Sequence, residues 1–112
     1  MKNYRKRIAD DILMRKLEGK GAVLIEGPKW CGKTTTAEQL AASILYMDDP
    51  EKKAQNITMS ELNPKRLLKG ATPRLIDEWQ LAPNLWDAIR REVDARNGEK
   101  GQFMLTGSAV PV

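Results

Sequence analysis

The chain has 112 residues, of which 41% are hydrophobic and 30% charged, and its formal net charge at pH 7 is +4. This composition is typical of an ordinary folded chain, and the length predicts one domain over residues 1–112. The sequence has no histidine and one cysteine, which excludes histidine-based metal sites, histidine general bases and an internal disulfide. No apolar run approaches the ~20 residues of a membrane span, so we expect a cytoplasmic protein without a membrane partner.

The N-terminal segment predicts an amphipathic helix from about Tyr4 to Leu17, because Ile8, Ile12 and Leu13 recur on one side of a helical wheel. The basic residues around it are most simply a solvated helix face. A nucleic-acid contact there is the alternative, and it has weak support because the chain is only mildly basic.

A short apolar run, Ala22–Ile25, predicts a buried strand, and residues 35–42 after it predict a helix. Between them the chain fits the pattern G-x-x-x-x-G-K-[ST] of a phosphate-binding loop, which requires this strand–loop–helix context. The predicted nucleotide-binding residues are those of the motif and the next position: Gly27, Pro28, Lys29, Trp30, Cys31, Gly32, Lys33, Thr34 and Thr35.

The chemistry of this motif follows from its backbone and two side chains. Glycines let successive N–H groups curl toward phosphate oxygens, and the following helix adds the positive end of its dipole. Lys33 would reach the β- and γ-phosphates, and the Thr34 hydroxyl would coordinate Mg²⁺. The alternative is a turn bounded by glycines that carries a surface lysine.

Three further strands are predicted, at 44–47, 74–77 and 102–106. A polar connection with helical turns spans about 51–69, and an amphipathic helix begins near Pro83 and ends by Gly98, with Leu85, Trp86, Ile89 and Val93 facing inward. Strands that are unbroken apolar runs and alternate with helices predict a parallel sheet inside a three-layer α/β/α sandwich.

Asp77 ends the third predicted strand and Glu78 follows it, at the place where an acid would be needed to hold Mg²⁺. We expect Asp77 to be the metal ligand and Glu78, which would point to the opposite side of the strand end, to be the general base toward a water. The alternative is a pair of solvated acids capping the next turn.

Thr106-Gly107-Ser108 ends the fourth predicted strand, and a hydroxyl there could sense the γ-phosphate or orient the attacking water. A simple turn is the alternative interpretation. Gln80 is considered as a water-positioning residue, with an exposed loop residue as the preferred alternative. Trp79 and Trp86 could lie near the nucleotide base, although core packing is favoured for Trp86.

The segments GPKWCGKT, LIDEWQLAPNLWDAIRREVD and GQFMLTGSA together resemble the prokaryotic AAA-type P-loop ATPases over nearly the whole chain. The resemblance implies ATP and Mg²⁺ as ligands, with Lys33 and Thr34 on phosphate and metal and Asp77 on Mg²⁺. It also implies Glu78 as the catalytic base and Thr106 as a sensor. The additional-strand class to which such proteins belong implies a sheet order of 1-4-3-2.

Family members continue beyond a fourth strand, whereas this chain ends at Val112, so the resemblance predicts a truncated domain with slow or absent hydrolysis. Its missing partners would be the C-terminal region of the same protein and, since such proteins often form rings, further copies of the chain. The purely apolar first strand would then lie at a sheet edge.

Two alternatives to an ATPase remain open. A small-molecule kinase would use Asp48 and Asp49 at the end of the second strand to take a substrate hydroxyl, but adjacent strand residues face opposite ways. The second alternative is a nucleotide-gated binding or regulatory module for nucleic acid or a partner protein, which would bind nucleotide without useful hydrolysis. A GTPase is disfavoured, because the chain has no Asn-Lys-x-Asp sequence and Trp79 stands where glycine is expected.

Overall fold

The computed structural model describes residues 21–27 and 33–108, and the predicted helix Tyr4–Leu17 lies outside these ranges. The described chain has four strands, four α-helices and one short 3₁₀ helix. The strands are β1 (Ala22–Gly27), β2 (Ser43–Tyr46), β3 (Arg74–Asp77) and β4 (Phe103–Ser108). The helices are α2 (Lys33–Leu40), α3 (Lys53–Leu62), α4 (Pro64–Leu67), the 3₁₀ helix η2 (Trp79–Leu81) and α5 (Asn84–Ala95).

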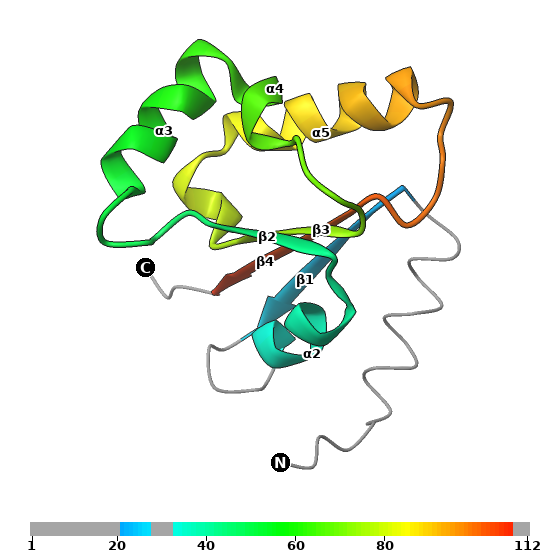
Figure 1. The fold of residues 1–112 in the computed structure, drawn as a ribbon, viewed down its shortest axis with the longest axis horizontal. Helices are drawn as coiled ribbons and strands as arrows, with labels where there is room; N and C mark the ends of the chain where they lie inside the picture. The colour runs from blue at the N-terminus through cyan, green and yellow to red at the C-terminus, as the bar shows by residue number, and fades with distance from the viewer. Residues whose placement is uncertain (1–20, 28–32, 109–112) are drawn as a thin grey trace.

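The four strands form one sheet in the order β1-β4-β3-β2, and every neighbouring pair is parallel (Figure 1). This order confirms the prediction. The last described strand, β4, therefore lies between the first and the third, and β1 is an outer strand of the described sheet. Because all strands run the same way, their carboxyl ends share one edge of the sheet, where ligands bind in folds of this type.

Helices cover both faces of the sheet, as predicted for a three-layer α/β/α sandwich (Figure 1). On one face α2 packs through Ala37 against Val23, Leu75 and Met104. On the other face α4, η2 and α5 close a larger core, and α3 packs against its margin. The buried residues of that core are Met47, Leu67, Leu68, Ile76, Ala82, Leu85, Ile89, Phe103 and Leu105.

Several element boundaries differ from the prediction. Strand β2 spans Ser43–Tyr46, one residue earlier than the predicted 44–47, and β4 begins at Phe103 and not at residue 102. Helix α2 ends at Leu40 and not at Ala42, because the backbone N–H of Ala42 already donates to the carbonyl of Pro73 and leads into β2. Strand β1 extends to Gly27 and β4 to Ser108, since these two residues are paired across the sheet.

Helix α5 has its inward face at Leu85 and Ile89, both buried, as predicted. The prediction that Trp86 packs in the core is wrong: its side chain is 40% exposed. Leu85 takes the inward direction, which turns the next residue along the helix away from the sheet. Trp86 packs instead on Trp79 of η2, with ring centroids 5.4 Å apart and ring planes tilted by 37°.

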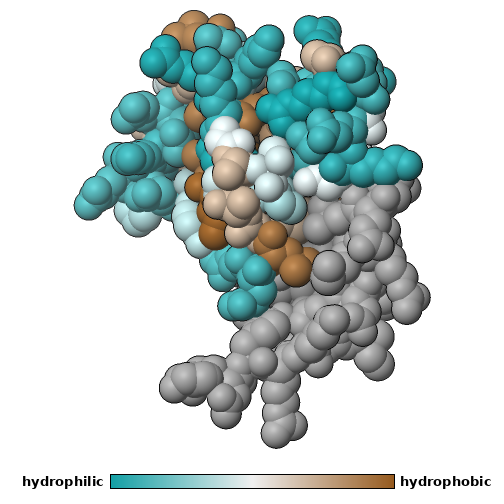
Figure 2. Space-filling model, turned by 45° about the vertical axis from the view of Figure 1, so that its right-hand side comes forward, coloured by the Kyte–Doolittle hydropathy of each residue, from teal (hydrophilic) through white to brown (hydrophobic). Residues whose placement is uncertain are grey.

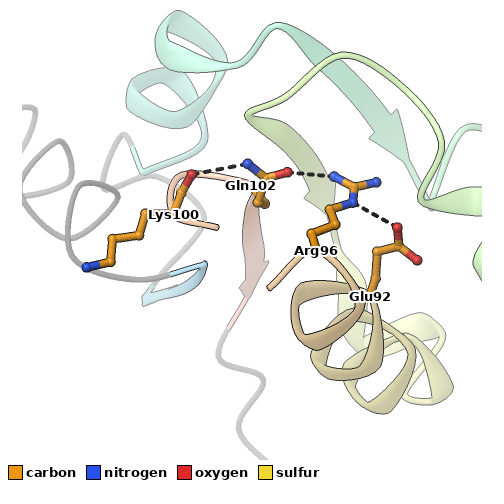
Figure 3. A network of polar contacts seen from close by, with 4 residues as sticks. All are labelled: Glu92, Arg96, Lys100 and Gln102. Atoms are coloured by element: carbon orange, nitrogen blue, oxygen red, sulfur yellow. Dashed lines mark hydrogen bonds and ion pairs between the residues drawn. The ribbon is translucent and has the colours of Figure 1, made fainter. Parts of the chain in front are cut away.

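A polar network fixes the end of α5 to the start of β4 (Figure 3). Arg96 Nε donates to Glu92 Oε2 at 2.8 Å, and its Nη1 donates to Gln102 Oε1 at 2.6 Å. Gln102 Nε2 in turn donates to the carbonyl of Lys100 at 3.1 Å. The guanidinium also lies 5.2 Å from the centroid of the Phe103 ring, a cation–π distance. These contacts lie at the end of the sheet where the strands begin, opposite the end where their carboxyl termini meet.

In the view of Figure 2, hydrophilic side chains cover much of the described surface, and apolar atoms reach it in a band beside the grey residues. Leu62, at the end of α3, is the most exposed of the large hydrophobic side chains described, at 77%. None of the helices within residues 33–108 is both long enough and apolar enough to traverse a lipid bilayer.

Candidate functional site

A row of four residues crosses the carboxyl edge of the sheet on the face that α2 covers. Parallel register places Ile25 beside Thr106, Thr106 beside Asp77, and Asp77 beside Tyr46. Each of the four lies two positions after a strand residue of the core that packs against α2. Side chains two residues apart on a strand point to the same face of the sheet. The row therefore brings the predicted metal ligand and the predicted sensor side by side.

Asp77 and Thr106 are in direct contact. Thr106 Oγ1 donates to Asp77 Oδ1 at 2.7 Å, a short bond of the kind that a carboxylate acceptor makes. The Thr106 side chain is fully buried and Asp77 is 8% exposed. Asp77 has further partners besides Thr106. A buried carboxylate must be held by donors or a cation, and this one is held at the edge where the sheet would meet a ligand.

Glu78 leaves the strand in a left-handed conformation, with φ 56° and ψ 48°. Such a backbone conformation is uncommon for a residue other than glycine. It breaks the strand pattern in which successive side chains point to opposite faces, which would otherwise turn Glu78 directly away from Asp77. Glu78 is 6% exposed. Its carboxylate Oε1 accepts a hydrogen bond from Gln80 Nε2 at 2.5 Å.

Gln80 is half-buried, and the preferred prediction that it is an exposed loop residue is wrong. The 3₁₀ helix η2 folds back against the end of β4, so that Gln80 Oε1 and the indole of Trp79 face Gly107 closely. The neighbouring residue Thr106 faces α2, whereas Gly107 faces η2. Thr106 therefore contacts the Asp77 side chain, and the next residue of β4, Gly107, lies against Gln80, whose amide donates to Glu78.

Tyr46 completes the row, and sequence reasoning missed it. Its hydroxyl donates to Glu38 Oε2 on α2 at 2.5 Å. This hydrogen bond, then partial burial, then the negative charges of Glu38 and Asp77 raise the pKa of Tyr46 to about 12. The one available signal was that Tyr46 lies near the end of a predicted strand. The structure ends β2 at Tyr46, and register places it beside Asp77.

The predicted phosphate-binding residues are placed only in part. Gly27 ends β1, whereas residues 28–32, the remainder of the predicted loop up to Lys33, lie outside the described ranges. Lys33, Thr34 and Thr35 form the first turn of α2. This helix begins after β1 ends, and Figure 1 shows it beside the tip of the β1 arrow, so its positive end belongs to the same edge as Asp77.

The donors at this edge suit a hard cation with few protein ligands. The carboxylate of Asp77 and the hydroxyl of Thr106 are both oxygen groups, which Mg²⁺ prefers. Residues 21–27 and 33–108 contain no group of three or more histidine, cysteine, aspartate or glutamate side chains placed to enclose a metal. Mg²⁺ in proteins usually keeps several waters and takes one or two carboxylates, and Asp77 supplies one carboxylate at this edge.

Asp48 and Asp49 follow β2, where a kinase would need a base. Asp48 is exposed, and Asp49 is occupied in the turn that leads to α3. Asp49 Oδ1 accepts from the backbone N–H of Glu51 at 2.9 Å, and its carbonyl accepts from Lys52 and Lys53. Such a side chain–backbone turn is a structural role, so neither acid is directed at the Asp77 row by the contacts described.

In a comparison with protein families, the model of a family described as an AAA domain matches residues 19–112. No curated protein and no solved structure matches the chain significantly.

Proposed function

The chain belongs to the AAA domain family, and from this premise we propose that it binds Mg-ATP at the carboxyl edge of its sheet and hydrolyses it slowly. The observation that carries the proposal is the buried contact between Thr106 and Asp77, in a row beside the N-terminus of α2. The family supports nucleotide binding and ATPase-like activity in general, and the row supplies oxygen donors where a metal–phosphate group would bind.

Each predicted site residue would have its own role in binding or hydrolysis. The loop Gly27–Gly32, through the backbone N–H groups of its residues other than Pro28, would bind phosphate oxygens together with Lys33 and Thr35 at the start of α2. Thr34 and Asp77 would hold Mg²⁺, which when bound would offset charge on the phosphates. Glu78 would hold and deprotonate the attacking water, and Thr106 would keep Asp77 oriented and sense the γ-phosphate.

Two rival functions are weaker on the present geometry. A small-molecule kinase would need Asp48 or Asp49 free at the β2 end, and Asp49 caps a turn instead. A module that binds nucleotide without useful hydrolysis would share every feature except a working Glu78, so turnover of a Glu78 variant separates it from an ATPase. As further parts of the proposal, residues 1–112 act as one domain in the cytoplasm, and copies of the chain associate.

Thermal unfolding with Mg-ATP, with Mg-GTP and without nucleotide tests the binding site, with Lys33→Ala as the matched variant. Ligand that binds only the folded state stabilises it by about 2.7 kcal/mol at a hundred times its Kd. We expect ATP to raise the midpoint of the parent chain and to leave that of Lys33→Ala unchanged. An equal rise in both would refute the assignment of the phosphate site.

Glu78→Gln tests hydrolysis separately from binding. The amide keeps the size of the side chain and loses the basic oxygen, so we expect the ATP-induced rise in midpoint to remain. We expect phosphate release to fall about 10²- to 10⁴-fold, the usual contribution of a general base. If Glu78→Gln released phosphate at the parent rate, the measured hydrolysis would come from a contaminating enzyme. The chain would then be the module that binds nucleotide without hydrolysing it.

A further inference from the structure

We propose that Gln80 is a positioning residue for Glu78: its amide fixes the direction of the Glu78 carboxylate, and Gly107 at the end of β4 provides the space that makes this contact possible. The inference rests on the proposed function for its catalytic consequence. The contact itself is a property of the described residues, independent of turnover.

The first observation is the hydrogen bond from Gln80 Nε2 to Glu78 Oε1, at 2.5 Å. Glu78 lies in a left-handed turn between β3 and η2, where no strand alternation sets the direction of its side chain. A donor two residues further along the same turn can set that direction. A carboxylate that must point at a water gains from such a restraint, because misplacement of a reacting group is costly to rate.

The second observation is the other end of the same amide. Gln80 Oε1 is enclosed and has no hydrogen-bond partner among the described residues. A buried acceptor in this state is unfavourable and calls for an explanation. Exchanging the amide oxygen and nitrogen would not relieve it, because the oxygen would then face the carboxylate of Glu78. The contact with Glu78 therefore determines the orientation of the amide.

The third observation is the residue opposite. Gly107 lies where a Cβ atom would overlap Gln80 Oε1 and come within 3.2 Å of the Trp79 indole. The backbone of Gly107 is not in a left-handed conformation, so glycine is required there for space and not for its dihedral freedom. The end of β4 thus contacts Asp77 through Thr106 and accommodates Gln80 through Gly107.

Three variants of this contact separate positioning from packing. Gln80→Ala removes the side chain, Gln80→Met keeps its length but has neither a donor nor a charge, and Gln55→Ala on the exposed side of α3 is the control. We expect kcat for ATP to fall about 10- to 100-fold in both Gln80 variants with KM nearly unchanged, and to be unaffected in the control. Parent-level turnover in Gln80→Met would overturn the proposal, because the length of the side chain alone would then suffice.

Gly107→Ala gives an independent route to the same contact. The added methyl group should displace Gln80 and lower kcat in the parent background. In the Gln80→Ala background it should cost less, since the space is then open, and the two changes are predicted to be non-additive. Fully additive effects would show that Gly107 acts apart from Gln80 and would contradict its assigned part.

A measurement without turnover keeps this test distinct from that of the proposed function. The side-chain NH₂ signals of Gln80, identified in ¹⁵N spectra by their loss in Gln80→Ala, should shift strongly in Glu78→Ala. They should not move in Glu61→Ala, which changes an exposed acid on α3. If the Gln80 NH₂ signals did not shift in Glu78→Ala, the positioning role would be overturned. If they shifted but the chain did not hydrolyse ATP, only the ATPase proposal would be contradicted.

Discussion

The Thr106 hydroxyl and the Asp77 carboxylate, 29 residues apart in the chain, are joined by a buried hydrogen bond of 2.7 Å between neighbouring parallel strands. The bond depends on register: a shift of β4 against β3 by one residue would turn Thr106 to the opposite face. The pair therefore reports directly on whether the central strands are correctly aligned.

We expect Thr106→Val to destabilise the chain by about 1–3 kcal/mol, because a hydrogen bond to a buried charged group is lost without a change of shape. Thr106→Ser keeps the hydroxyl and should recover part of this loss. Urea unfolding of the three chains measures the differences. A valine variant as stable as the parent would show that the other partners of Asp77 satisfy it alone.

Tyr46 gives a prediction in alkaline solution. Its pKa in the folded chain, about 12, is above the ordinary value of 10, chiefly because its hydroxyl donates to Glu38. The folded state thus binds this proton more tightly than the unfolded state does. The resulting stabilisation is fully present below pH 10 and is lost as the pH rises from 10 through about 12.

Tyrosinate absorbance during an alkaline titration tests this. The parent chain should show one late ionisation step near pH 12, and Tyr46→Phe should lack it. Glu38→Gln should move the step to lower pH, since the anionic acceptor is gone. If the late step persisted in Tyr46→Phe, another group would be its source and the Tyr46–Glu38 bond would lose its support.

Two leucines offer a matched test of the core. Leu85 is fully buried beneath α5, whereas Leu62 at the end of α3 is 77% exposed. We expect Leu85→Ala to cost about 2–5 kcal/mol through lost burial and a cavity, and Leu62→Ala to stay within about 0.5 kcal/mol. Thermal and urea unfolding measure both. Equal losses would mean that α5 does not close the core as described.

The sheet was predictable because its elements carry local signals. Runs such as Arg74–Asp77 and Gln102–Thr106 are short and apolar between turn residues, and this pattern predicts buried parallel strands. The strand order 1-4-3-2 followed from the resemblance and is confirmed. The placement of Asp77 next to Thr106 follows from that order together with register, so this half of the candidate site was within reach of the sequence.

The other half was not predictable, because it depends on local backbone and tertiary contact. No pattern in the sequence indicates that Glu78 adopts a left-handed conformation, and this turn is what brings Gln80 onto its carboxylate. The Tyr46–Glu38 bond joins a strand to a helix, and its geometry depends on how α2 packs. Trp86 was misplaced because α5 buries a narrower face than its apolar residues suggest.

The position of β4 has a consequence for the order in which the chain can fold. In the described sheet β1 has β4 as its neighbour, so Ala22 must wait for Phe103 before it gains a strand partner. Closing so long a loop is slow, and a chain emerging from the ribosome would hold β1 unpaired until nearly all of these residues had been made. The insertion of β4 would join β1 to the other described strands and assemble the Asp77–Thr106 pair in a single event.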